Sequence, residues 1–283
     1  MWIYLQDRFV RKEEAKVSVF DRGFLYGDGL FETFRAYHGR IFLLSQHLER
    51  LAQGADRLAL PLPTPSEIET ILYQTLEKNG LEEALLRLTL TRGEGEGGFD
   101  PERCEHPTLL VTARPFTGHP PERYRNGVTA AIVQIRRNAP ATLDPALKST
   151  SFLNNVIAKL EAKKEGAFEG LLMTLDGYLS EGSVSNLFWV RQGTLQTPSP
   201  AVGLLRGITR EVVITLAHQK EIEVEEGFYR PEALLNADEA FLTNSSFELM
   251  PLTEVNGRKI GSGAPGPLTQ ALHQAFREVV RER

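Results

Sequence analysis

The stretch ALKSTSFLNNVIAKLEA, residues 146–162, combines a lone lysine with the start of a helix. Lys148 stands in a short polar segment after a strand-like region, and the apolar spacing that follows predicts a helix over about 151–166. A lone lysine is most often a solvated surface charge. A buried lysine, however, readily loses its proton and forms Schiff bases with carbonyl compounds. The stretch alone therefore leaves two interpretations of Lys148 open.

Three later stretches place polar groups at the ends of predicted strands and helices. In GYLSEGSVSNLFWV (177–190), Glu181 stands among small residues between two apolar segments, either as a turn residue or as an inward charge that needs a cation. In GLLRGITREVVI (203–214), a glycine precedes a helix start, where backbone N–H groups are able to bind an anion. In FLTNSSFELMP (241–251), a polar turn follows a strand. Each pattern is common, and none specifies a function alone.

The order of predicted elements divides the chain into two parts. The first half shows hairpin signals, then two helices, then two strands at 84–91 and 108–114. Ser45 is the expected cap of the first helix. The second helix begins with a capping box, in which Thr64 and Glu67 bond each other's backbone N–H groups. A segment rich in proline and glycine, 115–121, is typical of a linker, and the chain beyond it is rich in strands.

Composition excludes several classes of protein. The chain has 283 residues, a net charge of −5 and 24% charged residues, which argues against a nucleic-acid binder and against disorder. One cysteine, Cys104, allows neither an intrachain disulfide nor a four-cysteine zinc site, and no metal is expected. No apolar run approaches the roughly 20 residues of a membrane helix. We expect a cytoplasmic protein without nucleic-acid or membrane partners.

Two further patterns have modest interpretations. The stretch GEGEGG (93–98) matches G-x-G-x-x-G, which indicates dinucleotide binding only between a strand and a helix. The residues after it, Phe99-Asp100-Pro101, do not open a convincing helix, so a flexible glycine loop is expected. His47 lies on a predicted helix face beside a charged neighbour, and we expect it at the surface.

Taken in order, these stretches resemble one family. The resemblance begins with DRGFLYGDGLFETFRAYHG (21–39) and HLERL (47–51), continues through the stretches around Lys148, Glu181 and GITR (207–210), and ends with FLTNSSFELMPLTEVNG (241–257). These motifs resemble those of the fold-type IV pyridoxal-phosphate enzymes, the class IV aminotransferases. That group includes branched-chain and D-amino-acid aminotransferases and aminodeoxychorismate lyase. The resemblance implies an α/β (α+β) fold, with a small α/β domain at 1–115, a linker at 116–121 and a larger, barrel-like cofactor-binding domain at 122–283.

The resemblance also implies a cofactor, pyridoxal 5′-phosphate, and residues that hold it. Lys148 occupies the position of the Schiff-base lysine, which also moves the α-proton as acid and base. Glu181 matches the carboxylate that faces the pyridine nitrogen and keeps it protonated. The phosphate is expected to bind Arg50, Ile208, Thr209 and Ser245.

The implied reaction is transamination between an amino acid and a 2-oxo acid such as 2-oxoglutarate, carried out by a homodimer. Tyr26, Arg35 and Arg87 match positions that line the substrate pocket of branched-chain enzymes, which favours a branched-chain-like L-amino acid. Leu153, however, stands where those enzymes carry a tyrosine. Aminodeoxychorismate lyase and D-amino-acid or (R)-amine transaminase are therefore kept as alternatives. A non-catalytic binding protein on the same fold is a further alternative.

Overall fold

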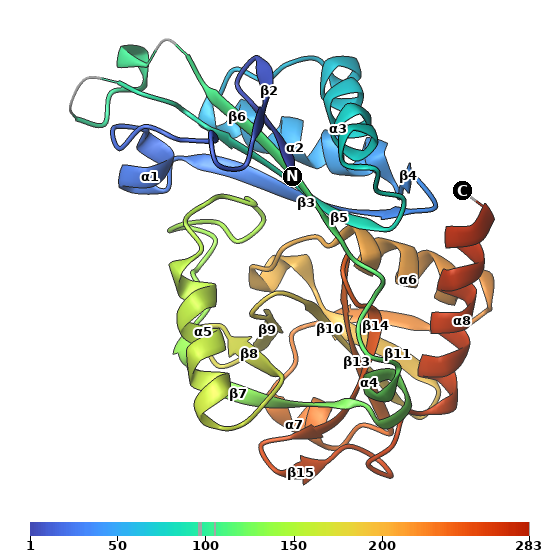
Figure 1. Ribbon diagram of the computed structural model, residues 1–283. Helices are drawn as coiled ribbons and strands as arrows, with labels where there is room; N and C mark the ends of the chain where they lie inside the picture. Colours follow the sequence, from blue (N-terminus) through green and yellow to red (C-terminus); the bar gives the residue numbers. More distant parts are fainter. Residues whose placement is uncertain (96–97, 105, 283) are drawn as a thin grey trace. The chain divides into compact units, whose positions relative to one another are not determined.

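The structure is a computed structural model that describes residues 1–95, 98–104 and 106–282. The predicted glycine loop at 93–98 lies partly outside these residues. Contacts within the chain separate two compact units (Figure 1): residues 1–117 with 147–152, and residues 118–146 with the chain from 153 onward. The boundary after residue 117 lies within the expected linker. Residues 147–152, which we expected in the second domain, belong to the first unit.

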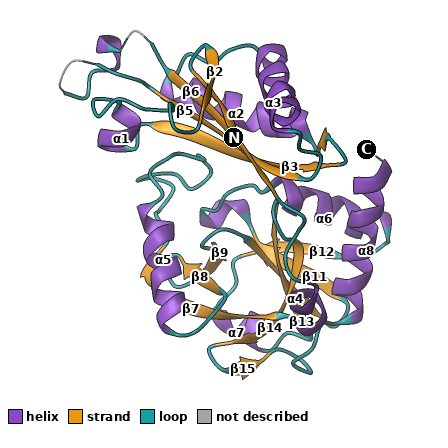
Figure 2. Cartoon of the chain, viewed as in Figure 1, coloured by secondary structure: helices purple, strands orange, loops and turns teal. Residues whose placement is uncertain are grey.

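The first unit is built on a sheet that, in the described residues, has six strands in the order β2-β1-β6-β5-β3-β4 (Figure 2). Neighbouring strands are antiparallel. The elements of this unit are β1 (Trp2–Leu5), β2 (Arg8–Arg11), α1 (Arg22–Tyr26), β3 (Gly29–Tyr37), β4 (Arg40–Ile41), α2 (Leu44–Leu58), α3 (Pro65–Asn79), β5 (Ala84–Thr91), a 3₁₀ turn (Pro101–Arg103) and β6 (Thr108–Pro115).

The two longer helices of this unit begin in different ways. Thr64 and Glu67 form the expected capping box, so α3 starts where the sequence predicts. Helix α2 begins at Leu44, after Leu43 in the left-handed conformation at φ 50°, and has no side-chain cap. Ser45 therefore lies inside the first turn, and the expectation that it caps the helix is wrong.

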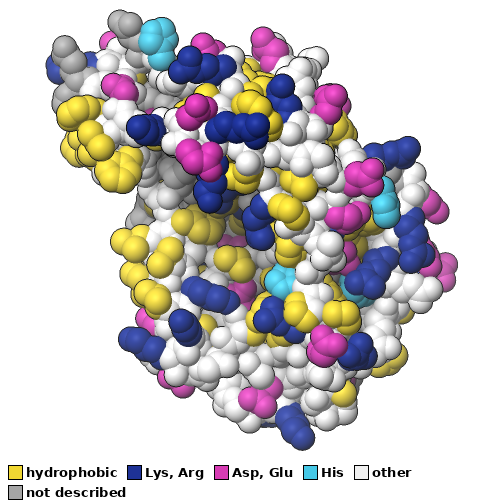
Figure 3. All heavy atoms as spheres, viewed as in Figure 1, with side chains coloured by type: hydrophobic (Ala, Val, Ile, Leu, Met, Phe, Trp, Pro, Cys, Tyr) yellow, Lys and Arg dark blue, Asp and Glu magenta, His cyan; other side chains and the backbone are white. Residues whose placement is uncertain are grey.

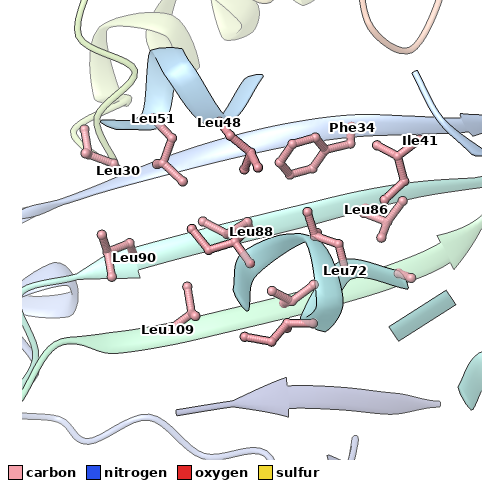
Figure 4. Packing of buried hydrophobic residues seen from close by; sticks show 14 of the residues in the cluster. Leu30, Phe34, Ile41, Leu48, Leu51, Leu72, Leu86, Leu88, Leu90 and Leu109 are labelled. Atoms are coloured by element: carbon pink, nitrogen blue, oxygen red, sulfur yellow. The ribbon is translucent and has the colours of Figure 1, made fainter. Parts of the chain in front are cut away.

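The core of the first unit lies between one face of the sheet and helices α2 and α3 (Figure 4). Side chains along a strand alternate between its two faces, so every second residue of β3 and β5 enters this core. Phe31 and Arg35 on β3, and Arg87 on β5, consequently lie on the opposite face. The buried members of the core include Leu30, Phe34, Leu48, Leu51, Leu72, Leu86, Leu88 and Leu90.

The second unit contains, in its described residues, a nine-stranded mixed sheet in the order β12-β11-β10-β13-β14-β7-β8-β9, with β15 paired to β14. The sheet curls, because β9 at one end of this order also contacts β10 and β11, and this confirms the expected barrel-like domain. Its elements are α4 (Pro121–Asn126), β7 (Val128–Arg136), α5 (Leu153–Lys164), β8 (Glu169–Met173), β9 (Leu179–Gly182), β10 (Asn186–Arg191), β11 (Thr194–Pro198), a 3₁₀ turn (Pro200–Val202), α6 (Ile208–Gln219), β12 (Val224–Gly227), α7 (Pro231–Leu235), β13 (Glu239–Asn244), β14 (Glu248–Val255), β15 (Arg258–Lys259) and α8 (Pro267–Glu282). Across the described ranges of the whole chain, no helix is both long and apolar enough to cross a membrane.

Candidate active site

Lys148 lies on a segment that pairs with the beginning of β3. The N–H of Phe31 donates to the carbonyl of Lys148 at 3.0 Å, and the N–H of Thr150 donates to the carbonyl of Gly29 at 2.8 Å. These two bonds fix the backbone on both sides of the lysine. They also explain why residues 147–152 belong to the first unit.

The Lys148 side chain lies over aromatic rings. Its Nζ is 4.6 Å from the ring centre of Phe31 and 6.0 Å from that of Phe152. The guanidinium carbon of Arg87 lies 3.8 Å from the same Phe31 centre. An aromatic face attracts cations through its ring quadrupole. Two basic groups thus lie over the Phe31 ring. They are the primary amine of Lys148 and the planar guanidinium of Arg87, whose paired donors suit a carboxylate.

Arg50 belongs to a buried ion network on the core face of β3. Its Nε and one terminal nitrogen donate to the two oxygens of Glu32 at 2.7 and 2.8 Å. Nδ1 of His47 lies 2.8 Å from Glu32 Oε2. Glu32 is 0% exposed and His47 2% exposed, so the expected surface position of His47 is wrong. The bidentate pair holds the Arg50 guanidinium in one orientation.

Burial affects the pKa values of both Glu32 and His47. Burial by itself raises the pKa of Glu32, but the Arg50 guanidinium and the His47 ring reverse this effect and hold that pKa far below its ordinary range. Burial lowers the pKa of His47, and this effect outweighs the attraction of Glu32. At neutral pH, Glu32 is therefore an anion and His47 is neutral. Arg50 is the cation that balances the buried carboxylate.

Arg35 does not join the group around Phe31. It lies four residues farther along β3, which is about 13 Å at 3.3 Å per residue. Its guanidinium is buried and pairs with Glu83 at 2.6 Å, and it also donates to the carbonyl of Phe116. Its charge is thus compensated locally by Glu83.

Tyr26 ends helix α1 and is exposed. Its ring packs on that of Phe99, with the ring centres 5.0 Å apart. The next residue, Gly27, has a φ of 69°, and its carbonyl accepts a hydrogen bond of 2.8 Å from the Thr150 hydroxyl. This bond ties the end of α1 to the segment that carries Lys148.

In the second unit, Glu181 lies buried on β9 with 4% of its surface exposed. Its Oε2 accepts a hydrogen bond of 3.0 Å from the N–H of Leu205 and one of 3.4 Å from the side-chain amide of Asn186. Its Oε1 lies 2.8 Å from a guanidinium nitrogen of Arg137. A carboxylate has about four acceptor positions. Glu181 is therefore held in place by an N–H, an amide and a guanidinium.

Ile208 and Thr209 form the first turn of α6. The residue before them, Gly207, caps the helix without a side-chain bond. A Cβ at this position would lie 2.1 Å from Asn186 Oδ1, so a larger residue would have to displace the Asn186 amide. The first N–H groups of a helix have no partner inside it, and the helix dipole makes them attractive to an anion. This helix start is suited to a phosphate group.

Ser245 lies in the turn between β13 and β14. The Asn244 side chain fixes this turn, because its Oδ1 accepts a hydrogen bond of 2.8 Å from the N–H of Ser246. Strand β13 pairs with β10 so that Thr243 stands opposite Asn186. Asn186 at the start of β10 thus links Glu181, the start of α6 and the end of β13, which leads into the Ser245 turn.

This part of the second unit fits pyridoxal phosphate chemically. Two buried polar atoms on residues that adjoin Glu181 and Asn186, namely Arg137 Nε and Thr243 Oγ1, have no hydrogen-bond partner among the described residues. Such atoms mark places where a polar ligand or water binds. The helix start and the Ser245 hydroxyl supply donors for a phosphate ester. Glu181 supplies an acceptor for a protonated ring nitrogen.

A sequence model of the family "Amino-transferase class IV" matches residues 29–255, a range that contains these cofactor-site residues. The chain belongs to the class IV aminotransferases. Enzymes of this family use pyridoxal phosphate, and this chain is a pyridoxal-phosphate-dependent transaminase of fold type IV. The expected family, fold class and cofactor are therefore confirmed.

This class IV aminotransferase is similar over nearly its whole length to proteins with different named reactions. It is 41% identical over 280 residues to the "Putative branched-chain-amino-acid aminotransferase" of Methanocaldococcus jannaschii, which covers 99% of this chain and 96% of the relative. It is 36% identical over 282 residues to the aminodeoxychorismate lyase of Bacillus subtilis, with 99% and 94% covered. The crystal structure of the branched-chain amino acid aminotransferase of Escherichia coli matches with a TM-score of 0.94 at 31% identity, covering 98% of this chain and 94% of that one.

Sequence reasoning about the aminotransferase missed two residues that contact Glu181. Asn186 stands five residues later, and the short connection at 183–185 between β9 and β10 brings it back beside Glu181. That tight connection, in which the N–H of Gly182 donates to the carbonyl of Ser185, was an available signal in the motif SEGSVSNLF. Arg137 lies in the polar stretch IRRN at the end of β7, and nothing in its local pattern indicates a partner on β9.

Proposed function

We propose that this aminotransferase moves the amino group of a branched-chain L-amino acid to 2-oxoglutarate. The observation that carries the proposal is the Phe31 ring, over which both the Lys148 amine and the Arg87 guanidinium lie. The ring offers an apolar surface to a hydrocarbon side chain. The guanidinium offers a partner to the second carboxylate of glutamate or 2-oxoglutarate. An enzyme that takes both kinds of substrate in turn needs both surfaces.

Each residue of the candidate site has a proposed role toward bound cofactor and substrate. Pyridoxal phosphate supplies an electrophilic carbonyl and an electron-withdrawing ring. The Lys148 amine takes the α-proton of the amino acid as base and later donates a proton as acid. Glu181 holds the proton on the ring nitrogen. Arg50, Ile208, Thr209 and Ser245 bind the phosphate.

Aminodeoxychorismate lyase is the second candidate function, and the similarity to the Bacillus subtilis lyase favours it. D-amino-acid or (R)-amine transamination is the third. The purified enzyme should be screened with L- and D-amino acids and 2-oxoglutarate, beside an assay with 4-amino-4-deoxychorismate. The proposal requires turnover of L-leucine or L-valine well above that of D-alanine and of aminodeoxychorismate. The reverse order overturns it.

Arg87→Met should harm dicarboxylate substrates more than leucine or valine. A hydrogen-bonded partner of a charged group contributes about 1.5–3 kcal/mol, so kcat/KM for 2-oxoglutarate should fall by about 10–150-fold. The matched control is Arg114→Met, because Arg114 is an exposed arginine on the neighbouring strand β6, over the ring of Phe116. Arg35→Met should lower stability without changing selectivity. Equal losses for leucine and 2-oxoglutarate in Arg87→Met count against the assigned contact.

Arg50→Ala should weaken cofactor binding and destabilise the protein even without cofactor. The phosphate loses a charge-assisted partner, which corresponds to about a 10–150-fold higher cofactor Kd. Glu32 stays buried but loses its bidentate cation, which costs stability in the apoprotein as well. Titration of the apoprotein with pyridoxamine phosphate gives the first effect, and Tm without cofactor gives the second. Arg57→Ala, at an exposed arginine of the same helix, is the control. A wild-type cofactor Kd in Arg50→Ala removes Arg50 from the phosphate site.

We propose that the enzyme is a cytoplasmic homodimer. Large apolar side chains gather on the surface over α1 and over α5 (Figure 3), and such patches are typical of protein–protein interfaces. A single cysteine suits a reducing compartment. Light scattering should give twice the chain mass. Phe24→Glu, at a residue of α1 that is 73% exposed, should shift that mass toward the monomer.

A further inference from the structure

Arg137 forms a buried ion pair with the carboxylate that the proposed function assigns to the ring nitrogen. A terminal nitrogen of its guanidinium lies 2.8 Å from Glu181 Oε1. Arg137 is 6% exposed and Glu181 is 4% exposed. Removing two charges from water is expensive unless each is paired and bonded further. The pair is therefore buried and differs from an ordinary surface salt bridge.

Amide groups hold Arg137 on its other side. One terminal nitrogen donates to Oδ1 of Asn155 at 2.9 Å and to Oδ1 of Asn154 at 3.2 Å. Asn155 is itself buried and donates to the carbonyl of Ser183 at 2.8 Å. The guanidinium cannot turn away from Glu181 without breaking these bonds. Its charge is thus fixed at one oxygen of the carboxylate.

The other groups around Glu181 orient it without adding charge. The Asn186 amide and the N–H of Leu205 approach its Oε2 from β10 and from the segment before α6. A second carboxylate, that of Glu169 on β8, lies close to the next residue, Gly182, because a Cβ there would meet Glu169 Cγ at 3.0 Å. Arg137 supplies a full positive charge that favours the ionised form of Glu181.

Burial disfavours the charged form of a carboxyl group, so such a group takes up a proton nearer neutral pH when it lacks a cation. A protonated Glu181 has to lose its proton before it accepts the protonated nitrogen of a pyridine ring. A guanidinium is charged at every accessible pH and prevents this competition. The amides of Asn186 and Leu205 cannot replace that effect.

We propose that Arg137 is a positioning residue that keeps Glu181 ionised and oriented toward the ring nitrogen of the cofactor. The inference rests on the proposed role of Glu181. It has a consequence that a purely structural arginine lacks, because the contribution of the ring nitrogen to cofactor affinity becomes independent of pH around neutrality. Without Arg137, each cofactor molecule that binds has to release the proton of Glu181.

The test compares pyridoxamine 5′-phosphate with its analogue in which the ring nitrogen is replaced by C–H. Neither compound attaches to Lys148, so both give reversible Kd values with the full-length apoprotein. The Kd of the analogue divided by the Kd of pyridoxamine 5′-phosphate isolates the contribution of the nitrogen. Between pH 8 and pH 6 this ratio should stay constant in the wild type. In Arg137→Met it should fall on acidification, by up to about tenfold per pH unit, as expected for one released proton.

Four further variants decide the outcome. Arg137→Lys keeps a cation and should restore the constant ratio. Arg125→Met, which removes an exposed arginine paired with Glu122, should behave as wild type. If Arg137→Met does not fold by circular dichroism, the contrast between Arg137→Gln and Arg137→Lys carries the test. A pH-independent ratio in the neutral variants overturns the inference. If the ring nitrogen still contributes to cofactor affinity in Glu181→Gln, the proposed role of Glu181 itself is overturned.

Discussion

Lys148→Ala should abolish transamination while the fold and reversible cofactor binding survive. The loss of a positioned acid and base costs about 10²–10⁴-fold in rate, and the loss of covalent attachment to the cofactor adds to this. The fold should survive because main-chain atoms, which alanine keeps, make the bonds between residue 148 and β3. The side chain's contact with the Phe31 ring contributes about 0.5–1 kcal/mol at a partly exposed position.

The matched control for Lys148→Ala is Lys159→Ala. The Lys159 amine also lies over an aromatic ring, 5.1 Å from the centre of Phe168, but on the exposed surface of α5. Both variants lose one charge and one ring contact, and Lys159→Ala also loses a hydrogen bond to the carbonyl of Phe168, so a loss of turnover confined to Lys148→Ala reports on chemistry. We expect wild-type turnover in Lys159→Ala and cofactor that dialyses away from Lys148→Ala. Turnover near wild type in Lys148→Ala would remove the residue from the mechanism.

Periodicity alone could have revealed the buried network around Arg50. Leu30 and Phe34 face the core, and a strand period of two places Glu32 with them. His47 and Arg50 are three residues apart, which puts them on one face of α2. The surface position expected for His47 gave too much weight to a charged neighbour. Combining the strand period of two with the helix spacing of three to four residues would have predicted that His47 and Arg50 meet Glu32.

Other parts of the site depend on contacts between distant segments. The bonds that join Phe31 to Lys148 connect segments from opposite sides of the expected linker, and no local pattern records them. The pairing of Arg137 with Glu181 joins the ends of two strands in the same way. Roles for Lys148 and Glu181 came from the resemblance to a family, because spacing alone favoured a surface lysine at 148 and allowed a turn carboxylate at 181.

Glu181→Gln should slow proton transfer while the protein still folds. Glutamine keeps the shape and one acceptor oxygen for the N–H of Leu205. It loses the negative charge, and a charge-assisted bond of about 1.5–3 kcal/mol corresponds to about a 10–150-fold slower step. Arg137 also loses its counter-ion, so Tm should fall. The loss should stay below the roughly 3–5 kcal/mol of a completely broken buried pair, because the amide oxygen still accepts a bond.

Measuring Glu239→Gln beside Glu181→Gln distinguishes an effect on the reaction rate from an effect on folding stability. Glu239 is a buried carboxylate of the same unit, and its oxygens accept from the N–H of Thr269 at 2.8 Å and from that of Leu268 at 3.1 Å at the start of α8. Both variants should lose stability, but only Glu181→Gln should lose rate. With an α-deuterated amino acid, the isotope effect on kcat should rise in Glu181→Gln, because proton transfer by Lys148 then limits turnover. An unchanged rate and isotope effect in that variant contradict a contact between Glu181 and the ring nitrogen, whatever happens to Tm.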